Sequence, residues 1–334
     1  MRTTMQTQPD ELRRLVGDRG PADAAAERIA GRRTWLVGIG TSWHAAQHGA
    51  WLLGTAGLDA AALHAADVAP YARTFDVTDA VIVLSHTGQT GYTAQAREAA
   101  REAGAAVVHV TGVGKGGDLE TVAPETSYAY TASHTGALMR LAQMASALGA
   151  QLGDLAAVPE AVASVLAAPG PVVEPPDRLL ELIGAGPNAW TAAEGALKVR
   201  EASYVATEGL SSEQFLHGPS VALDAQDTLV ALDGGGPAGR PHGGDLCRDG
   251  GDGRPRGADR RARSRRGALG LPVDGVGSAH RPRAGRGPRR ESRPLPLRGG
   301  PRARAGHRVT RLLIGGDAQS RSSASAMCRC PRIS

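Results

Sequence analysis

Short apolar runs alternate with longer amphipathic segments through the first 235 residues of the chain. Runs of strand length stand at "TWLVGIG" (34–40), "DAVIVLS" (79–85) and "AAVVHVTG" (105–112), with a weaker one at "AALHAADVA" (61–69). Between them, apolar positions recur at helical spacing in "TSWHAAQHGAWLL" (41–53), "TAQAREAAREAG" (93–104) and "TGALMRLAQMASALGAQLG" (135–153). Strands that alternate with helices predict a parallel sheet covered by helices on both faces.

The α/β pattern occurs twice. After the Pro-rich segment "AAPGPVVEPPDR" (167–178), "LIGAGPNAWTAAEGALKV" repeats "LVGIGTSWHAAQHGAWLL". Five pairs of identical residues stand 146 positions apart: Gly38 and Gly184, Gly40 and Gly186, Ala46 and Ala192, Gly49 and Gly195, and Ala50 and Ala196. A constant offset across strand, turn and helix indicates a duplicated unit. We therefore predict two similar sheets with a cleft between pseudo-symmetric halves.

Five segments follow from this pattern. They are an N-terminal helical segment (1–30), a first α/β domain (31–168), a Pro-rich linker (169–178), a second, truncated α/β domain (179–235), and a tail rich in Arg, Gly and Pro (236–334). In the first segment, "PDELRRLV" and "PADAAAERIAG" begin with Pro, and the second ends with Gly. Pro in the first turn and Gly at the end are typical of short helices.

Charge divides the chain at the same boundary. Of 38 Lys+Arg and 33 Asp+Glu residues, positions 237–334 hold 23 Arg, no Lys and 7 Asp+Glu, a net +16, which leaves −11 for residues 1–236. All three cysteines, Cys247, Cys328 and Cys330, lie in the basic tail. The acidic body therefore carries no disulfide framework, zinc cluster or nucleophilic thiol. The polar N-terminus and the lack of long apolar runs lead us to expect a cytoplasmic protein without a membrane segment.

The turn "LSHTGQTGYT" (84–93) places several hydroxyl side chains and two glycines directly after an apolar strand. Such a turn can hold a dianionic phosphate through hydroxyls and the free N–H groups of a helix start. It can equally be an ordinary capped turn, in which Ser and Thr satisfy the first N–H groups of the next helix. The segment alone does not separate these alternatives.

The glycines of "GIGTSW" (38–43) raise a third possibility, a dinucleotide site. Trp43 stands where the motif needs its third glycine. A bulky indole at that position obstructs the close packing of helix and strand. We therefore do not expect a nicotinamide cofactor.

Three motifs together resemble those of sugar isomerase (SIS) domain proteins: "GTS" (40–42), "SHTGQT" (85–90) and "EGALKVREASYVATEGLSSEQFLHGP" (194–219). The resemblance spans about residues 30–235 and is greatest to the isomerase half of glutamine:fructose-6-phosphate aminotransferases. It implies an α/β fold of two tandem SIS-type, flavodoxin-like three-layer α/β/α units with parallel sheets. The second unit would be incomplete and the tail irregular or disordered. A sugar-phosphate ligand is implied, with no metal and no cofactor.

By this resemblance, the phosphate is held by residues of the first repeat. The turn contributes Ser85, His86, Thr87, Gln89 and Thr90, with help from Gly40, Thr41 and Ser42. Ser133 matches a family position near the sugar, although a helix N-cap is an equal alternative for it. The acidic body holds only two lysines, Lys115 and Lys198, so a hydroxyl-rich turn is a sensible way to bind an anion.

The implied catalytic residues lie in the second repeat. Glu201 matches the carboxylate that moves a proton between C1 and C2 of the sugar through an enediol, a task that suits a partly buried acid. Glu194, Lys198 and Glu201 share one helical stripe, and such a stripe is usually a solvated face. His217, in "FLHGP", matches the histidine that opens the sugar ring and is reached across a dimer interface.

Two departures from the family pattern narrow the expected activity. No cysteine stands near the N-terminus for glutamine hydrolysis, and the late loop whose lysine assists isomerisation in the aminotransferases is missing. We therefore expect an aldose-ketose isomerase or a deaminase of amino-sugar phosphates, without glutaminase activity. A non-catalytic sugar-phosphate sensor is the alternative. Nucleic-acid binding by the basic tail is the least favoured function.

The tail from about Gly234 loses both periodicities, and it lacks the Lys and the stacking aromatic residues of a nucleic-acid-binding arm. Moving the codons of 271–298 forward by one nucleotide permits the string PLTVWVQRIALELAEALGANPDRFR. That string reads as an amphipathic helix and a turn, and it resembles the closing helix of SIS proteins. We interpret the tail as translated out of frame. A frame-corrected chain is expected to form a homodimer.

Resequencing the gene around the codons of Gly234 tests this interpretation. We expect the shifted frame to continue without a stop codon through the region that encodes 271–298. A stop codon early in that frame would contradict the interpretation.

Overall fold

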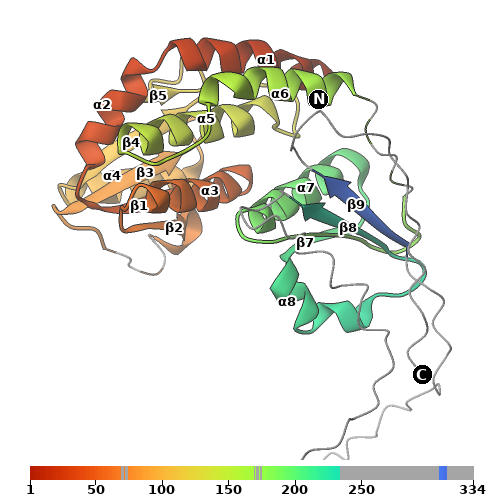
Figure 1. Cartoon of the computed structure of the whole chain (residues 1–334). Coiled ribbons are helices and arrows are strands. Elements are labelled where there is room, and N and C mark those ends of the chain that lie inside the picture. The colour runs from red at the N-terminus through yellow and green to blue at the C-terminus, as the bar shows by residue number, and fades with distance from the viewer. Residues whose placement is uncertain are drawn as a thin grey trace, which may run out of the picture.

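The computed structural model describes residues 1–68, 71, 74–168, 170, 173 and 175–232 in full, and the backbone of 233 and 308–313. These residues form two α/β units, each with its own parallel sheet (Figure 1). Within this part of the chain, no helix has the length and apolar character needed to cross a bilayer.

The first unit is built on a five-stranded sheet. Its strands are β1 (Arg33–Gly38), β2 (Ala60–His64), β3 (Asp79–Leu84), β4 (Ala106–Thr111) and β5 (Leu119–Glu120). Their order is β2-β1-β3-β4-β5, and all neighbours are parallel. This order is that of flavodoxin-like folds. The apolar runs of the sequence are thus strands, and the weak run at 61–69 is β2 followed by the 3-10 turn η1 (Ala65–Asp67).

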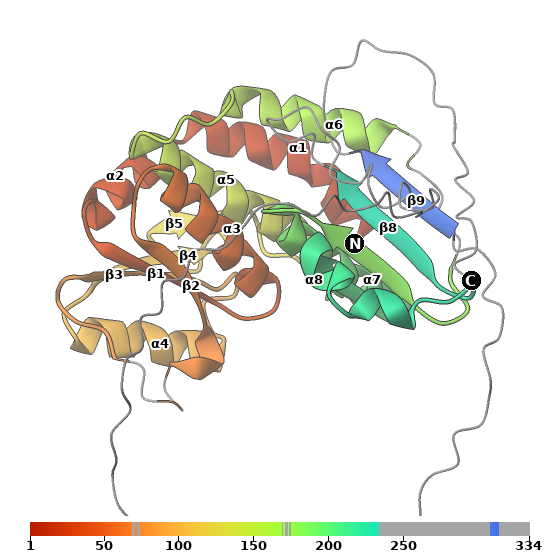
Figure 2. The same cartoon turned by 60° about the horizontal axis from the view of Figure 1, so that its bottom comes forward.

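Helices cover both faces of this sheet (Figures 1 and 2). The helices of this unit are α1 (Arg2–Gly17), α2 (Gly20–Ile29), α3 (Thr41–Thr55), α4 (Gly91–Glu102), α5 (Ala132–Ala147) and α6 (Val158–Ala167), with the 3-10 turn η2 (Leu155–Ala157) before α6. Of these, α1 and α6 pack together with α5 and not directly on the sheet. One core joins α2, α3 and α5 to Leu36 and Ile82. The other joins α4 and η1 to Val37, Val81 and Val83. The side chains of successive strand residues therefore pack into opposite helical layers, because side chains alternate between the two faces of a strand.

The second unit is smaller. Its strands are β6 (Leu180–Gly184), β7 (Thr207–Ser211), β8 (Thr228–Asp233) and β9 (Arg308–Leu313), all parallel, in the order β7-β6-β8-β9. Helix α7 (Asn188–Ser203) covers one face, and α8 (Ser212–Leu216), followed by η3 (Pro219–Ala222), covers the other through Phe215. Val221 of η3 is 71% exposed.

The prediction of an irregular tail is wrong for Arg308–Leu313, which forms β9 beside β8. The open edge of β8 offers unpaired backbone groups, and a short segment with β-branched Val and Thr can pair with them. The predicted change of reading frame otherwise concerns residues outside the described part of the chain.

The duplication of sequence is also a duplication of contacts. A Cβ on Gly38 would overlap the backbone carbonyl of Ser42, and a Cβ on Gly184 would overlap that of Asn188. Gly184 stands 146 residues after Gly38, and Asn188 stands 146 residues after Ser42. Glycine is therefore required at the end of β1 and β6 for the same reason, because the following helix starts directly against the strand.

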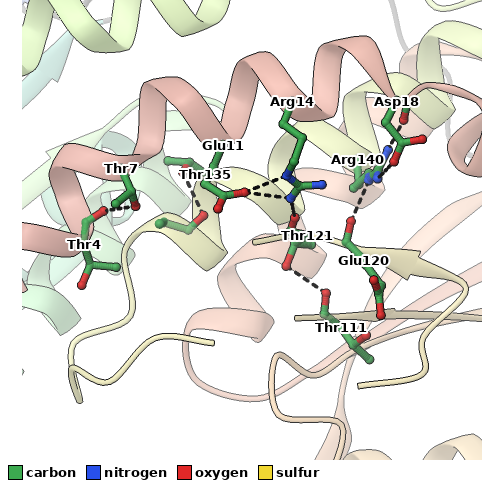
Figure 3. Close-up of polar contacts among 11 residues, drawn as sticks. Thr4, Thr7, Glu11, Arg14, Asp18, Thr111, Glu120, Thr121, Thr135 and Arg140 are labelled. Carbon is green, nitrogen blue, oxygen red and sulfur yellow. Dashed lines mark hydrogen bonds and ion pairs between the residues drawn. The ribbon is translucent and has the colours of Figure 1, made fainter. Parts of the chain in front are cut away.

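Arginine contacts hold α1 to the rest of the first unit (Figure 3). Arg140 of α5 is 1% exposed and donates to Glu120 O at 2.9 Å, to the carbonyl of Asp18, and to Asp18 Oδ2 at 2.7 Å. Arg14 of α1 donates to the carbonyl of Thr121. Because Glu120 and Thr121 belong to β5 and its end, α1 fixes the edge of the sheet next to the site described below.

Glu181 is a buried carboxyl group near the start of β6. It is 2% exposed, and its Oε1 has no hydrogen-bond partner among the described residues. Burial raises the pKa of Glu181 to about 7, with smaller contributions from the charges of Glu208, its register partner on β7, and Asp227. The second unit therefore contains an acid that is most stable in its neutral form.

We expect Arg140→Ala to lower the free energy of unfolding by about 2–4 kcal/mol, because it leaves buried acceptors unpaired and creates a cavity. Urea denaturation measures the change. The control is Arg13→Ala, which removes an exposed arginine of α1 that pairs with Asp10 and with Glu160 of α6 and should leave stability nearly unchanged. Equal effects of the two substitutions would contradict the assignment of Arg140 as the anchor of α1.

Glu181→Gln is expected to stabilise the protein at pH 8 but not at pH 5. The pKa of Glu181 is raised in the folded state, so the folded protein binds more protons than the unfolded chain between about pH 4.5 and 7. Stability from this group is therefore present at low pH and is lost as pH rises through 7. Denaturation of parent and variant across this range measures the difference, and a constant difference would contradict the prediction.

Candidate functional site

The hydroxyl-rich turn after β3 borders a small cavity. Ser85 directly follows β3 and is 4% exposed. It lines a cavity of about 30 Å³ together with Thr41, Ser42 and Ser133. This volume holds about two water molecules. The cavity therefore suits the oxygens of one anionic group and not a whole hexose phosphate.

This cavity lies at the carboxyl ends of β1 and β3. The chain leaves β1 to form β2 on one side of it and β3 on the other, so the strand order reverses between β1 and β3. Open parallel sheets bind ligands at such a switch point. Thr41 and Ser42 follow β1, and Ser85 follows β3, so both sides of the switch point contribute hydroxyl groups.

The start of α3 lacks a side-chain cap. The N-cap is Gly40, at a φ of 58°. Thr41 and Ser42 instead belong to the first turn, in which Ser42 N already donates to Ile39 O at 3.2 Å and Trp43 N to Gly40 O at 2.9 Å, while Thr41 contributes a hydroxyl and an N–H group. At the equivalent turn of the second unit, Pro187 offers neither a hydroxyl nor an N–H group. The two repeats therefore differ in their ability to bind an anion.

The rest of the turn is exposed. Thr87, Gln89 and Thr90 are open to solvent. Gln89 N donates to Thr87 Oγ1 at 3.3 Å, and Ser85 Oγ donates to Thr90 Oγ1 at 3.4 Å. Thr90 is the N-cap of α4 by position but makes no side-chain cap bond. The capped-turn alternative thus accounts for Thr87 and leaves Ser85 and Thr90 unexplained.

Ser133 is not the N-cap of its helix, because Thr131 occupies that position in α5. The carboxylate of Glu125 accepts hydrogen bonds from Ser133 N at 2.6 Å and from Thr131 N at 3.1 Å. A protein carboxylate thus fills the anion-binding end of α5. The helix starts left for a ligand at this edge are those of α3 and α4.

His86 lies in the wall of the cavity. Its Nε2 accepts from the backbone N–H of Glu125 at 3.3 Å, and its ring contacts that of Tyr130 at 5.5 Å. Burial lowers the pKa of His86, Lys115 lowers it further, and Glu125 opposes both. The imidazole is therefore neutral near pH 7 and supplies no positive charge for a phosphate.

A carboxylate of the second unit reaches the turn that starts α3. Glu194 of α7, with 8% of its side chain exposed, accepts from Thr41 Oγ1 at 3.1 Å and from His44 Nδ1 at 2.6 Å. Lys198 Nζ lies 3.5 Å from Glu194 Oε1 and 2.6 Å from Glu201 Oε2. A continuous set of polar contacts therefore joins Thr41 of the first repeat to Glu201 of the second.

The structure brings together two of the three predicted catalytic residues. Lys198 is 13% exposed at its side chain and is paired with Glu201, an exposed residue with 32% of its side chain open to solvent. His217 is the exposed C-cap of α8. Within the described residues, no hydrogen bond or ion pair joins His217 to Lys198 or Glu201.

The sequence placed Glu194 on a helical stripe without assigning it a role, and the three histidines around it, His44, His48 and His134, were not predicted. His48 and Glu194 stand 146 residues apart, and so do His44 and Trp190. The offset between the repeats therefore marked both pairs as equivalent positions on α3 and α7. Applied to polar positions as well as glycines, that offset was the signal that could have found them.

Two histidines of this cluster, His48 and His134, are neutral at pH 7. Burial lowers the pKa of His134 to about 4, although the charge of Glu194 opposes the shift. Burial also lowers the pKa of His48, whose Nε2 lies 3.2 Å from Thr191 Oγ1. Burial raises the pKa of Glu194, but the hydrogen bond from His44 and the charge of Lys198 outweigh this effect and hold the pKa below its usual value. The cluster therefore contains one buried, ionised carboxylate.

Besides these imidazoles, the site presents hydroxyl, carboxylate and ammonium groups. Within the part of the chain that the structure describes, no group of three or more His, Cys, Asp or Glu side chains is placed to hold a metal ion.

Comparison with known proteins gives related sequences and related folds. No family model matches the chain. It is 31% identical over 258 residues to the glutamine–fructose-6-phosphate aminotransferase (isomerizing) of Thermococcus kodakarensis, which covers 69% of this chain and 43% of that protein. It is 29% identical over 226 residues to the enzyme of the same name from Chlorobaculum tepidum, covering 60% of this chain and 37% of that enzyme. The chain thus spans less than half the length of these curated relatives.

Two solved structures share the fold. The tagatose-6-phosphate ketose/aldose isomerase of Escherichia coli superposes with a TM-score of 0.60 at 20% identity, over 71% of this chain and 74% of that one. The glucosamine-6-phosphate deaminase of Thermotoga maritima superposes with a TM-score of 0.58 at 18% identity, over 70% of this chain and 76% of that one.

Proposed function

Because the chain belongs to the SIS domain proteins, related to the isomerase domain of the glutamine–fructose-6-phosphate aminotransferases and to phosphosugar isomerases, we propose that it binds a sugar phosphate and isomerises or deaminates it. The substrate is an amino-sugar phosphate or its ketose counterpart. Proteins similar in sequence or fold are named as enzymes that isomerise or deaminate sugar phosphates. The site described above contains hydroxyl groups suited to a phosphate and an acid–base pair suited to proton transfer.

The observation that carries the proposal is the cavity at the β1/β3 switch point. Ser42, in the N-terminal turn of α3 after β1, and Ser85, directly after β3, both line it. Hydroxyl donors and a helix start together favour a phosphate group. The exposed hydroxyls of Thr87 and Thr90 extend the donors outward, so the phosphate sits at the cavity and the sugar lies outside it.

The second repeat supplies the proposed acid–base chemistry. Glu201 moves the proton between C1 and C2, and Lys198, 2.6 Å from it, stabilises the negative charge of the enediol. His217 opens the sugar ring from the partner subunit of a dimer. Closure of the site around the substrate provides the burial that Glu201 lacks.

One observation favours a sensor as the second candidate. Glu201 is exposed, and Lys198 is already neutralised by two carboxylates, those of Glu194 and Glu201. A site of this kind binds a sugar phosphate through the first repeat without turning it over.

Ser85→Ala is expected to weaken binding of fructose-6-phosphate and glucosamine-6-phosphate to the full chain by roughly tenfold or more, because a hydrogen bond to a charged group is lost. Isothermal titration calorimetry measures the dissociation constants. Ser164→Ala, which removes an exposed hydroxyl on α6, is the matched control and should bind as the parent does. Equal affinities in Ser85→Ala and the parent would overturn the phosphate site.

Glu201→Gln is expected to lower turnover by about 100-fold or more with little change in affinity, since the acid–base group is removed while the phosphate site stays intact. A coupled assay of both sugar phosphates measures the rate, and Glu213→Gln, an exposed glutamate on α8, is the control. Full turnover in Glu201→Gln contradicts the catalytic assignment. Tight binding without turnover in the parent supports the sensor.

A further inference from the structure

We propose that Glu194 is a positioning residue that fixes the phosphate-binding turn of the first repeat to the helix of the second repeat that carries Lys198 and Glu201. The effect on catalysis rests on the proposed function, whereas the effect on the structure of the turn is testable without a ligand. It assigns a role to a buried carboxylate that neither the phosphate site nor the acid–base pair uses directly.

The contacts of Glu194 reach both repeats. Its Oε1 accepts from Thr41 Oγ1 at 3.1 Å and lies 3.5 Å from Lys198 Nζ, and its Oε2 accepts from His44 Nδ1 at 2.6 Å. Thr41 and His44 are both in the first turn of α3. The carboxylate of Glu194 therefore binds the first turn of α3, next to the cavity, and also pairs with Lys198 on its own helix α7.

The orientation of the Thr41 hydroxyl follows from this bond. An ionised carboxylate only accepts hydrogen bonds, so Thr41 Oγ1 must donate its proton to Glu194. That proton is then not available to a phosphate. Thr41 therefore acts through its position in the turn. Ser42 and Ser85 supply hydroxyls to a ligand, Ser85 in place of its long 3.4 Å bond to Thr90 Oγ1.

The pseudo-symmetry of the chain shows that packing alone does not require this carboxylate. The offset of 146 residues maps His44 onto Trp190 and Glu194 onto His48. The contact between His44 and Glu194 therefore has an equivalent in the contact between Trp190 and His48, whose ring centroids are 5.6 Å apart. On that side two rings join α3 to α7 with no carboxylate. The charged contact occurs on the side where the turn carries hydroxyl groups.

Charge in the cluster also favours a positioning role. Lys198 lies between Glu194 and Glu201, so its ammonium group is shared by a buried and an exposed carboxylate. Glu194 thereby sets the place of Lys198 on the inner side, toward α3. Removing the charge of Glu194 frees Lys198 to pair with Glu201 alone, and the distance between the phosphate turn and the acid–base pair is no longer fixed.

The structural test is amide hydrogen exchange of the full chain without ligand. We expect exchange at residues 41–45 to be faster by roughly tenfold or more in Glu194→Gln than in the parent, since a hydrogen bond to a charged group is lost. Thr191→Val is the matched control, because Thr191 lies on the same face of α7 and contacts His48 instead of the turn. Unchanged exchange at 41–45 in Glu194→Gln, or an equal increase in Thr191→Val, would overturn the inference.

Substitutions of Thr41 keep the inference testable should Glu194→Gln fail to fold. Thr41→Val removes the same bond from the other side and is expected to speed exchange at 41–45, whereas Thr41→Ser keeps the hydroxyl and is expected to behave as the parent. Loss of protection in both, or in neither, contradicts the role of this bond.

The functional test separates the two proposals. In a chain that turns over sugar phosphates, Glu194→Gln should lower kcat by about tenfold or more and change the affinity for inorganic phosphate by less than about threefold. A parent that binds no sugar phosphate refutes the proposed function, while the exchange result still decides the role of Glu194. An affinity for inorganic phosphate that falls as steeply as kcat makes Glu194 part of the phosphate site and overturns the positioning role.

Discussion

The proposed site depends on two helices, α3 and α7, whose first turns each lie directly against the end of the preceding strand. Only glycine at that strand end permits so close an approach. Gly38 and Gly184 leave no room for a side chain next to the first turns of α3 and α7. The N–H groups of α3 are thereby aimed at the carboxyl end of the sheet, where its order reverses. Any side chain at Gly38 would push α3 away from β1, and the cavity lined by Ser42 and Ser85 would open.

The two repeats show how one scaffold supports different tasks. Their glycines, their parallel strands and the contact between α3 and α7 obey the same pseudo-symmetry. The side chains added to that scaffold do not: Thr41 and Ser42 follow the first glycine turn, and Pro187 and Asn188 follow the second. In the same way His48 on α3 faces a tryptophan, whereas its equivalent Glu194 on α7 binds a threonine and a histidine. Anion binding and acid–base chemistry are thus divided between repeats that share one backbone plan.

Much of the fold followed from the sequence because periodicity and glycine position are local properties. The apolar runs became strands, and the offset between repeats anticipated the equivalent turns. Capping was less predictable: Thr131 is the N-cap of α5, although Ser133 was an equal candidate from sequence, and Gly40 precedes α3 without a side-chain cap, since several small polar residues in a row satisfy the same pattern. Burial at the interface between repeats was not predictable at all. Glu194 and Glu201 share a helical stripe, yet the packing of α3 buries the first and leaves the second exposed.

The central claim is that a sugar phosphate docks with its phosphate at the β1/β3 switch point. Hydrogen exchange of the full chain with and without saturating glucosamine-6-phosphate tests it most directly, because it reads the binding place without assuming a reaction. The account predicts slower exchange at residues 41–45 and 86–94, which form the two helix starts. Slower exchange confined to other segments, with these two unchanged, would contradict it.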